Sequence, residues 1–277
     1  MNAKLKKILI KSKKEVFSEI VGNNSSKLKG EGYDFLELKE YEYGEDVKNI
    51  DWVISAKLQK PYVKVFHAQK ELNINIVPIL NGSVYFGTDV FKQDLICEIS
   101  SILAFSAIKQ GDTFSSYIAN NNIEVCTKKS KKNFSVNRMA ENIFNYKSVG
   151  KKCDYKAICN QLFSHLKRRS LIFLIGDFFD SSKIDLKLLS KKHEVVVIIV
   201  RDKFEENLTT LGNVQLRDLE NGIEYKGILD KTSINEYKKL LKQNDHILYE
   251  HLRKCNINFI KIYTDENPFS KLIRLMK

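Results

Sequence analysis

Residues 73–87, NINIVPILNGSVYFG, decide the fold. Residues 74–80 are apolar at every position except Asn75. A short run that is apolar on both faces is typical of a strand covered on both sides of a sheet. Pro78 counts against a central strand, because proline has no N–H to donate to a neighbouring strand. The pattern as a whole still favours a buried strand.

The residues after this strand predict a turn and then a helix. Asn81, Gly82 and Ser83 have the small polar side chains that form turns. Apolar residues then recur at helical spacing over residues 91–109. A strand, a polar turn and a helix open a doubly wound α/β sheet, in which ligands bind beyond the carboxyl ends of the strands. The turn at residues 81–85 is therefore the first place to look for function.

Predicted strands and helices alternate from about residue 72 onward. This alternation predicts a mainly parallel sheet with helices on both faces. The further strands are expected at 113–119 and 123–126, which form a hairpin, and at 171–175, 195–200, weakly at 214–219, and at 257–263. The further helices are expected at 136–146, 155–168, 184–191, 230–254 and 268–277.

Residues 1–71 do not follow this alternation. We predict that they form an N-terminal extension packed on a sheet domain of residues 72–277. The extension begins with a basic amphipathic helix over residues 1–21, whose apolar face we expect to lie on the protein's own body rather than on a membrane. It ends with a first strand at residues 62–66.

The only tryptophan, Trp52, lies among alternating charges in this extension. We expect it to clasp the extension to the sheet domain, with Asp51 accepting hydrogen bonds from the backbone or from Lys57. The alternative is that Trp52 is a hot spot for a partner protein, since exposed tryptophans often anchor interfaces.

The composition leaves a second class of function open. The chain has 277 residues, 43% hydrophobic content and a formal net charge of +12. This content supports a full core, and the charge favours a nucleic-acid or anionic-membrane partner. Arginine is scarce and few aromatic residues lie between the lysines, so a basic nucleic-acid-binding protein is the alternative and not the main interpretation.

Cysteine usage and hydropathy indicate the compartment. The five cysteines are odd in number and no CxxC occurs, which favours a reducing compartment over a disulfide scaffold. No apolar run approaches the roughly 18 residues that a membrane span needs. We therefore predict a cytoplasmic protein with no membrane span.

A longer pattern carries a family resemblance. LKEYEYGEDVKNIDWVISAK at 38–57 lies between GYDF at 32–35 and YVKVF at 62–66. It resembles the bacterial family called domain of unknown function fifty-eight, whose members look like von Willebrand factor A-type domains with an N-terminal extension. The matching positions are Gly44, Asp46, Ile50, Asp51, Trp52 and Ala56, while Lys39, Lys48 and Lys57 stand for arginines, Glu45 for an aspartate and Asp34 for a glutamate. LRDLENG at 216–222 and IYTDEN at 262–267 resemble later segments of the family.

The resemblance implies a metal-ion-dependent adhesion site at the carboxyl edge of the sheet. Its ligands map to Asn81, Ser83 and Tyr85, to Cys153 at a threonine position, and to Asp177. Only Ser83 and Asp177 match, since Asn81 lacks the charge, Tyr85 is too long, and Cys153 offers a soft sulfur to a hard cation. We expect a degenerate site at Asn81, Ser83 and Asp177, with no resident cofactor and weak Mg²⁺ binding at most.

The resemblance also implies the function. It implies a non-enzymatic protein–protein interaction module, an adaptor or co-chaperone whose partner is a MoxR-type AAA+ ATPase. The sequence contains neither a P-loop nor a nucleophile elbow, and this argues against a hydrolase at the strand ends. We expect the partner to bind where the loops at 81–86, 151–154 and 177–180 converge. The candidate contacts are Tyr85, Phe86, Cys153, Asp154, Phe178 and Phe179.

Overall fold

The computed structural model describes residues 2–23, 35–66, 71–179 and 184–276. It divides into two compact units. One, the sheet unit, comprises residues 1–21 and 72–277, and the other, the insert unit, comprises residues 22–71. Within the described ranges, no helix combines the length and the apolar character needed to cross a membrane.

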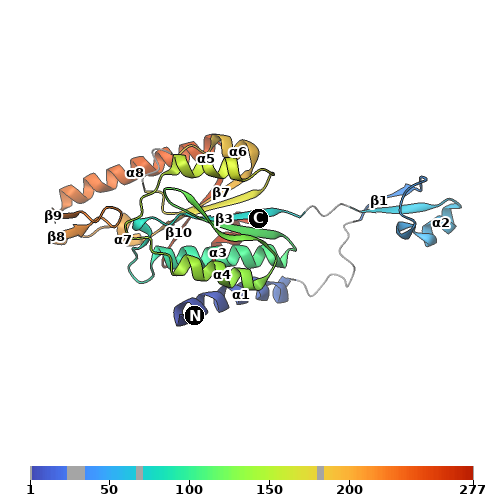
Figure 1. Ribbon diagram of the computed structural model, residues 1–277, viewed down its shortest axis with the longest axis horizontal. Coiled ribbons are helices and arrows are strands. Elements are labelled where there is room, and N and C mark those ends of the chain that lie inside the picture. The colour runs from blue at the N-terminus through green and yellow to red at the C-terminus, as the bar shows by residue number, and fades with distance from the viewer. Residues whose placement is uncertain (1, 24–34, 67–70, 180–183, 277) are drawn as a thin grey trace. The chain divides into compact units, whose positions relative to one another are not determined.

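The sheet unit is built on a six-stranded sheet (Figure 1). All neighbouring strands are parallel except β4 and β5, which form the predicted hairpin. The doubly wound, mainly parallel α/β fold is therefore confirmed. Across the sheet the strands are β10 (Asn258–Tyr263), β7 (Glu194–Arg201), β6 (Leu171–Gly176), β3 (Asn73–Pro78), β4 (Thr113–Ala119) and β5 (Ile123–Ser130).

β3 lies in the middle of the sheet although it contains Pro78. Pro78 is the last residue of the strand and pairs with Ile175 of β6. The next N–H, that of Ile79, donates to the Ile175 carbonyl at 2.7 Å. The missing donor therefore falls at the end of the ladder, where proline is tolerated. Every residue of β3 after Asn73 is buried, as the apolar run predicts.

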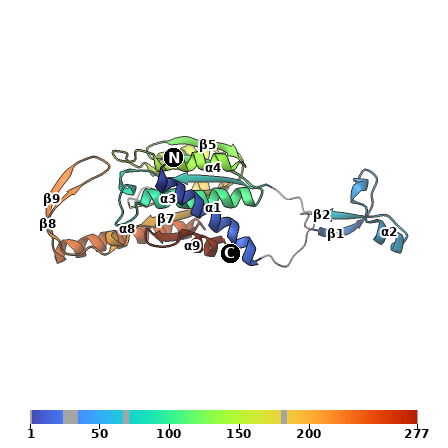
Figure 2. The same ribbon diagram turned by 90° about the horizontal axis from the view of Figure 1, so that it is seen from below.

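Helices cover both faces of the sheet (Figures 1 and 2). Each face has its own hydrophobic cluster. One face carries α1 (Ala3–Asn23), α3 (Lys92–Lys109), α4 (Asn133–Phe144) and α9 (Pro268–Met276), and the other carries α5 (Tyr155–His165), α6 (Lys187–Lys192) and α8 (Lys231–Lys254). The short helix α7 (Lys203–Glu206) follows β7. The predicted helices all occur, with shifted ends.

The basic helix α1 belongs to the sheet unit. Leu5, Ile8 and Leu9 are buried in the cluster that α3 helps to form, and Lys11 pairs with Glu98 of α3 at 2.6 Å. The predicted packing of this helix on the protein's own body is confirmed. Residues 1–71 are nevertheless not one extension, because the helix joins the sheet unit and the rest forms a unit of its own.

The insert unit is a small αβ element. β1 (Phe35–Glu40) pairs antiparallel with β2 (Tyr62–Phe66), and η1 (Val47–Asn49) and α2 (Trp52–Leu58) lie between them in the chain. Gly44 has a φ of 106°, which favours glycine. Of the residues that carry the family resemblance, those at 32–34 lie outside the described residues.

Asp51 explains one part of the family pattern. It is the N-cap of α2, and its side chain accepts from the N–H groups of Val53 and Ile54, both at 3.1 Å. It also pairs with Lys64 of β2 at 2.9 Å, where the sequence had suggested Lys57. A capped helix tied to a strand holds the unit together without a large core.

Trp52 opens α2 and is 69% exposed. Exposed Val53 and Val47 lie near it in the chain. Trp52 is therefore not an interior residue of the insert unit. Its predicted role as a clasp to the sheet unit, and its alternative role as a partner hot spot, both stay predictions.

A second hairpin interrupts the sheet unit between β7 and α8 (Figures 1 and 2). β8 (Gly212–Arg217) pairs antiparallel with β9 (Glu224–Leu229). The sequence predicts only a weak strand at 214–219 and misses β9. Charged residues and a glycine lower the strand propensity of EYKGIL. Its pairing with β8 stabilises the strand in spite of this low propensity.

Candidate functional site

Three loops meet at the carboxyl edge of the sheet, as predicted. In the loop after β3, the N–H of Gly82 donates to the carbonyl of Lys151 in the second loop at 2.8 Å. In the loop after β6, Phe178 stacks on Tyr155, with ring centroids 5.7 Å apart. Asp180, at the end of the third loop, lies outside the described residues. The convergence of the loops is confirmed.

The tip of the β8–β9 hairpin reaches the same edge. The Leu219 carbonyl accepts from the N–H of Gly150 at 2.7 Å, and the Glu220 carboxylate accepts from the side-chain amide of Asn81 at 2.6 Å. A Cβ on Gly82 would lie 2.2 Å from the Leu219 carbonyl oxygen, so a side chain there would force the tip away. The hairpin is therefore docked on the candidate site.

A fully buried lysine, Lys92, lies at the centre of this edge. Its ammonium donates to Oδ2 of Asp177 at 3.0 Å and to Oε1 of Glu205 at 2.6 Å. It also faces the ring of Phe179, 4.7 Å from the centroid. A buried ammonium needs paired charge and satisfied protons, and two carboxylates and an aromatic face supply them.

Sequence reasoning missed Lys92. It stands four residues before Ile96 and seven before Ile99, on the buried stripe of α3. Residues at this spacing share one helix face, so the pattern itself places a lysine on an apolar face. A charged side chain at a position that the spacing assigns to the buried face is the signal from which a buried, paired lysine could have been predicted.

Asp177 remains charged in this environment. Burial works to raise its pKa, and the positive charges of Lys92 and Arg201, with the Ser83 hydroxyl, outweigh burial and hold the pKa below its ordinary value. Oδ1 of Asp177, Oγ of Ser83 and Oδ1 of Asn81 are buried without a well-formed hydrogen bond to any described residue. The Ser83 hydroxyl lies near enough to the carboxylate to lower its pKa without reaching bonding geometry.

The residues present do not fit a resident divalent cation. Asp177 is the one carboxylate among the positions that the family resemblance assigns, and Lys92 already pairs with it. Mg²⁺ depends on carboxylate ligands, and the charges of Lys92 and Arg201 repel it at short range. Tyr85 is 46% exposed and stacks on Phe91, away from a ligand position. The expectation of weak Mg²⁺ binding at most stays a prediction.

The contacts of Cys153 and Asp154 indicate a structural role for both residues. Asp154 is the N-cap of α5, and its side chain accepts from the N–H of Ala157 at 3.0 Å. Cys153 is half-buried against the hydrophobic cluster on that face, and burial raises the pKa of its thiol. A protonated, half-buried thiol is a poor nucleophile and a poor metal ligand.

Three of the four aromatic candidates are buried or half-buried. Phe178 is fully buried, so its predicted role as a partner contact is wrong and it is a core residue. Phe179 is half-buried, and the guanidinium of Arg201 lies 3.7 Å from its ring centroid. Phe86 is also half-buried, while Tyr85 is exposed. Tyr85 is therefore the aromatic residue of this set that is open to a partner.

Two charged residues at the end of β7 complete the edge. Arg201 is fully buried and donates to Asp245 of α8 at 2.9 Å. Asp202 accepts from the N–H of Thr88 at 2.9 Å, from the Thr88 hydroxyl at 2.8 Å and from the Thr264 hydroxyl at 2.7 Å. These bonds tie the segments after β3, β7 and β10 to one another.

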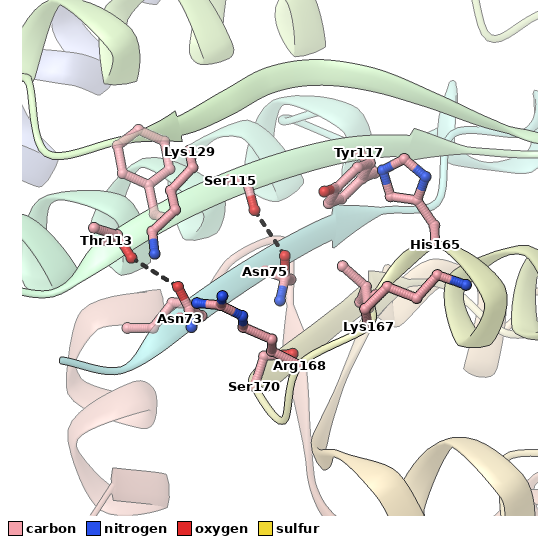
Figure 3. Close-up of a pocket in the computed structure, with 13 residues that line it drawn as sticks. Asn73, Asn75, Thr113, Ser115, Tyr117, Lys129, His165, Lys167, Arg168 and Ser170 are labelled. Atoms are coloured by element: carbon pink, nitrogen blue, oxygen red, sulfur yellow. Dashed lines mark hydrogen bonds between the residues drawn. The ribbon is translucent and has the colours of Figure 1, made fainter. Parts of the chain in front are cut away.

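A cavity of about 370 Å³, lined by polar and apolar residues, lies near the opposite, amino edge of the sheet (Figure 3). Inside it, the Ser115 hydroxyl donates to the side-chain carbonyl of Asn75 at 2.7 Å. The described residues that line it include no carboxylate. The basic side chains around it are Lys129 of β5 and His165, Lys167 and Arg168 of the segment before β6.

The fold and the site define a doubly wound α/β protein whose strand-end site is closed by a lysine. The sequence profile of the family described as "Protein of unknown function DUF58" matches residues 37–245. The chain belongs to this family, and the membership predicted from the sequence is confirmed.

Relatives and solved structures extend the comparison. "Uncharacterized protein Rv1480" of Mycobacterium tuberculosis is 22% identical over 281 residues, which cover 99% of this chain and 88% of the relative. A crystal structure of the conserved hypothetical protein BatB from Bacteroides thetaiotaomicron is 11% identical, with a TM-score of 0.48 over 74% of this chain and 97% of the other. A von Willebrand factor type A structure from Catenulispora acidiphila is 12% identical, with a TM-score of 0.36 over 66% and 44%.

Proposed function

We propose that this protein is a non-enzymatic, cytoplasmic protein-binding module that acts as adaptor or co-chaperone of a MoxR-type AAA+ ATPase. The class of partner follows from the family resemblance. The observation that carries protein binding is the hairpin surface, which we define as the face of β8 and β9 that bears Val214, Leu216, Tyr225 and Leu229.

The hairpin surface is apolar and open. Leu216 lies opposite Tyr225 in the register, and these side chains are 54% and 55% exposed. The other face of the same hairpin carries mostly polar side chains, such as the opposed pair Gln215 and Lys226. An isolated two-stranded hairpin is marginally stable in water, and tyrosine is enriched at protein interfaces and among their hot spots.

The hairpin also connects this surface to the carboxyl edge. Its tip is docked through Leu219 on Gly150 and through Glu220 on Asn81. A partner bound to the hairpin therefore acts on the loops that hold the candidate site. Exposed Tyr85 offers a further aromatic contact at that edge.

The test compares the two faces of the hairpin. Leu216→Ala with Tyr225→Ala removes the apolar pair, and Gln215→Ala with Lys226→Ala removes the matched polar pair. We expect the apolar double variant to weaken binding of the co-expressed ATPase by about 30-fold or more, as for a hot spot, and the polar one to leave it nearly unchanged. Equal losses in the two variants, or no loss in a folded apolar variant, would contradict the hairpin as the interface.

The cavity in Figure 3 favours one second candidate function, nucleic-acid binding. Its basic rim is suited to phosphate. Tyr117, which packs edge-on against His165 with ring centroids 5.3 Å apart, is buried in its lining. Fluorescence anisotropy with a labelled oligonucleotide at several salt concentrations tests it. If the cavity binds phosphates, Lys129→Ala with Arg168→Ala lowers the slope of log affinity against log salt by roughly 1–2. Lys6→Ala with Lys7→Ala, which removes two exposed lysines of α1, is the matched control.

A further inference from the structure

We infer that the Lys92 ammonium is a tethered replacement for a divalent cation at the carboxyl edge, and that removing it opens a divalent-cation site there. The inference concerns the chain's own site and holds whichever partner the protein binds.

The groups around Lys92 are those that a hard cation binds. Two carboxylates, of Asp177 and Glu205, converge on one ammonium nitrogen at 3.0 and 2.6 Å. Both are shielded from solvent, with side-chain exposures of 1% and 14%. Carboxylate oxygens are the ligands that Mg²⁺ and Ca²⁺ prefer. The ammonium therefore occupies the centre of an oxygen-rich, negatively charged position.

The second oxygen of the Asp177 carboxylate, Oδ1, is also buried, as are Oγ of Ser83 and Oδ1 of Asn81 in the loop after β3. None of the three makes a well-formed hydrogen bond to a described residue. The ammonium's own donors are directed at the two carboxylates. The Ser83 hydroxyl acts on the Asp177 carboxylate. A divalent ion in place of the Lys92 ammonium would supply a partner for the oxygens that lack a well-formed hydrogen bond.

Charge explains why Lys92 and a metal ion exclude each other. A divalent ion within a few ångströms of a fixed ammonium is repelled strongly, and burial prevents salt from screening that repulsion. Arg201 adds a second positive charge, which acts on Asp177. A covalently attached cation also costs no loss of translational freedom on binding. The site is therefore assembled in every molecule, independently of the supply of metal.

The experiment measures Mn²⁺ binding to the full chain by electron paramagnetic resonance and calorimetry. We expect Lys92→Ala to bind one Mn²⁺ at least about tenfold more tightly than the unmodified chain, because a repelling charge has gone. Mn²⁺ and Mg²⁺ should also raise the thermal midpoint of this variant in a saturable way and leave that of the unmodified chain unchanged.

Two controls place the ion. Adding Asp177→Asn to Lys92→Ala should abolish the gained binding, and adding Asn81→Ala with Ser83→Ala should weaken it. Lys203→Ala is the control, since Lys203 pairs at 2.6 Å with a single carboxylate, that of Asp265. An equal gain of Mn²⁺ binding in Lys203→Ala, or a gain that survives Asp177→Asn, would overturn the inference.

The unmodified chain supplies a test that does not depend on the stability of a variant. If it binds Mn²⁺ at micromolar concentration, and the paramagnetic ion broadens the resonances of Asp177 and Ser83, then Lys92 does not exclude the metal and the inference is wrong. If Lys92→Ala does not fold without metal, its refolding in Mn²⁺ but not in chelator supports the inference. Lys92→Gln then serves as a second variant that also removes the positive charge.

Discussion

Gly82→Ala tests whether the β8–β9 hairpin is docked on the carboxyl edge. The added Cβ would lie 2.2 Å from the carbonyl oxygen and 2.4 Å from the carbonyl carbon of Leu219, and 2.7 Å from the N of Glu220. All three are backbone atoms, so no side-chain rotation relieves the clash. The hairpin tip must move away, and its bonds to Gly150 and Asn81 are lost.

The expected loss follows from these two bonds. The Gly150 N–H to Leu219 carbonyl bond contributes about 1 kcal/mol, and the Asn81 amide to Glu220 carboxylate bond about 1.5–3 kcal/mol. Replacing glycine by alanine also stabilises the folded protein by about 0.4–1 kcal/mol, because it lowers the conformational entropy of the unfolded chain. The net destabilisation is therefore about 1.5–3.6 kcal/mol. At about 2–4 °C per kcal/mol for a unit of this size, the thermal midpoint falls by roughly 3–14 °C.

Hydrogen exchange distinguishes undocking from general loss of stability. We expect the amide of Gly150 and those of the hairpin to lose protection first in Gly82→Ala, while β3 and β6 stay protected. Gly227→Ala, in β9 of the same hairpin, is the matched control, because its Cβ meets nothing within 4 Å. A Gly82→Ala protein with an unchanged midpoint and unchanged protection at Gly150 would refute the docked arrangement.

Further predictions concern the core, the insert unit, acid stability and metal. Phe178→Ala should cost about 3–5 kcal/mol in chemical denaturation, because the ring is fully buried; a cost below 1 kcal/mol would contradict its assignment to the core. Trp52→Ala should cost about 3–5 kcal/mol if the residue clasps the insert unit to the sheet unit; a change of less than about 0.5 kcal/mol, as expected for a side chain that is 69% exposed, would contradict the clasp. The pKa of Asp202 lies below its ordinary value of 3.8, since hydrogen bonds from Thr264 and Thr88 outweigh burial. The charged Asp202 therefore stabilises the fold above about pH 3.8, and this contribution is lost as the pH falls through the lowered pKa. In Asp202→Asn, the free energy of unfolding should therefore depend less steeply on pH in the acid range. Chelator should leave partner binding unchanged, and loss of binding in chelator would mean that a metal bridges the contact.

The elements that carry a local pattern were predictable from the sequence. The apolar run at 74–80 placed β3, and the helical spacing over 91–109 placed α3 to within one residue. Because parallel strands end at one edge, the convergence of the loops after β3 and β6 followed from the alternation alone. The sequence did not predict α2, although Asp51 was expected to accept hydrogen bonds from the backbone; the structure shows that these come from the first turn of α2.

The electrostatic arrangement of the site was not predictable in the same way. Lys92 pairs with Asp177 and Glu205, which stand 85 and 113 residues away in the chain. The spacing of apolar residues shows which face of a helix or strand a residue lies on, but it does not show which distant residue it contacts. Phe178 was misassigned for a related reason: a residue in a strand-end loop is expected to be exposed, and its stacking on Tyr155 turns it inward.

The place of the insert unit in the chain affects how the protein folds. α1 contributes to the core of the sheet unit, yet the next residues of that unit begin at Leu72. Closing a loop of about 50 residues costs roughly 3.5 kcal/mol of chain entropy. The pairing of Phe35 with Phe66 brings together two distant positions within this stretch of chain, so a folded insert unit lowers the entropy cost of closing the loop. Folding of the insert unit should therefore favour the packing of α1 into the core of the sheet unit.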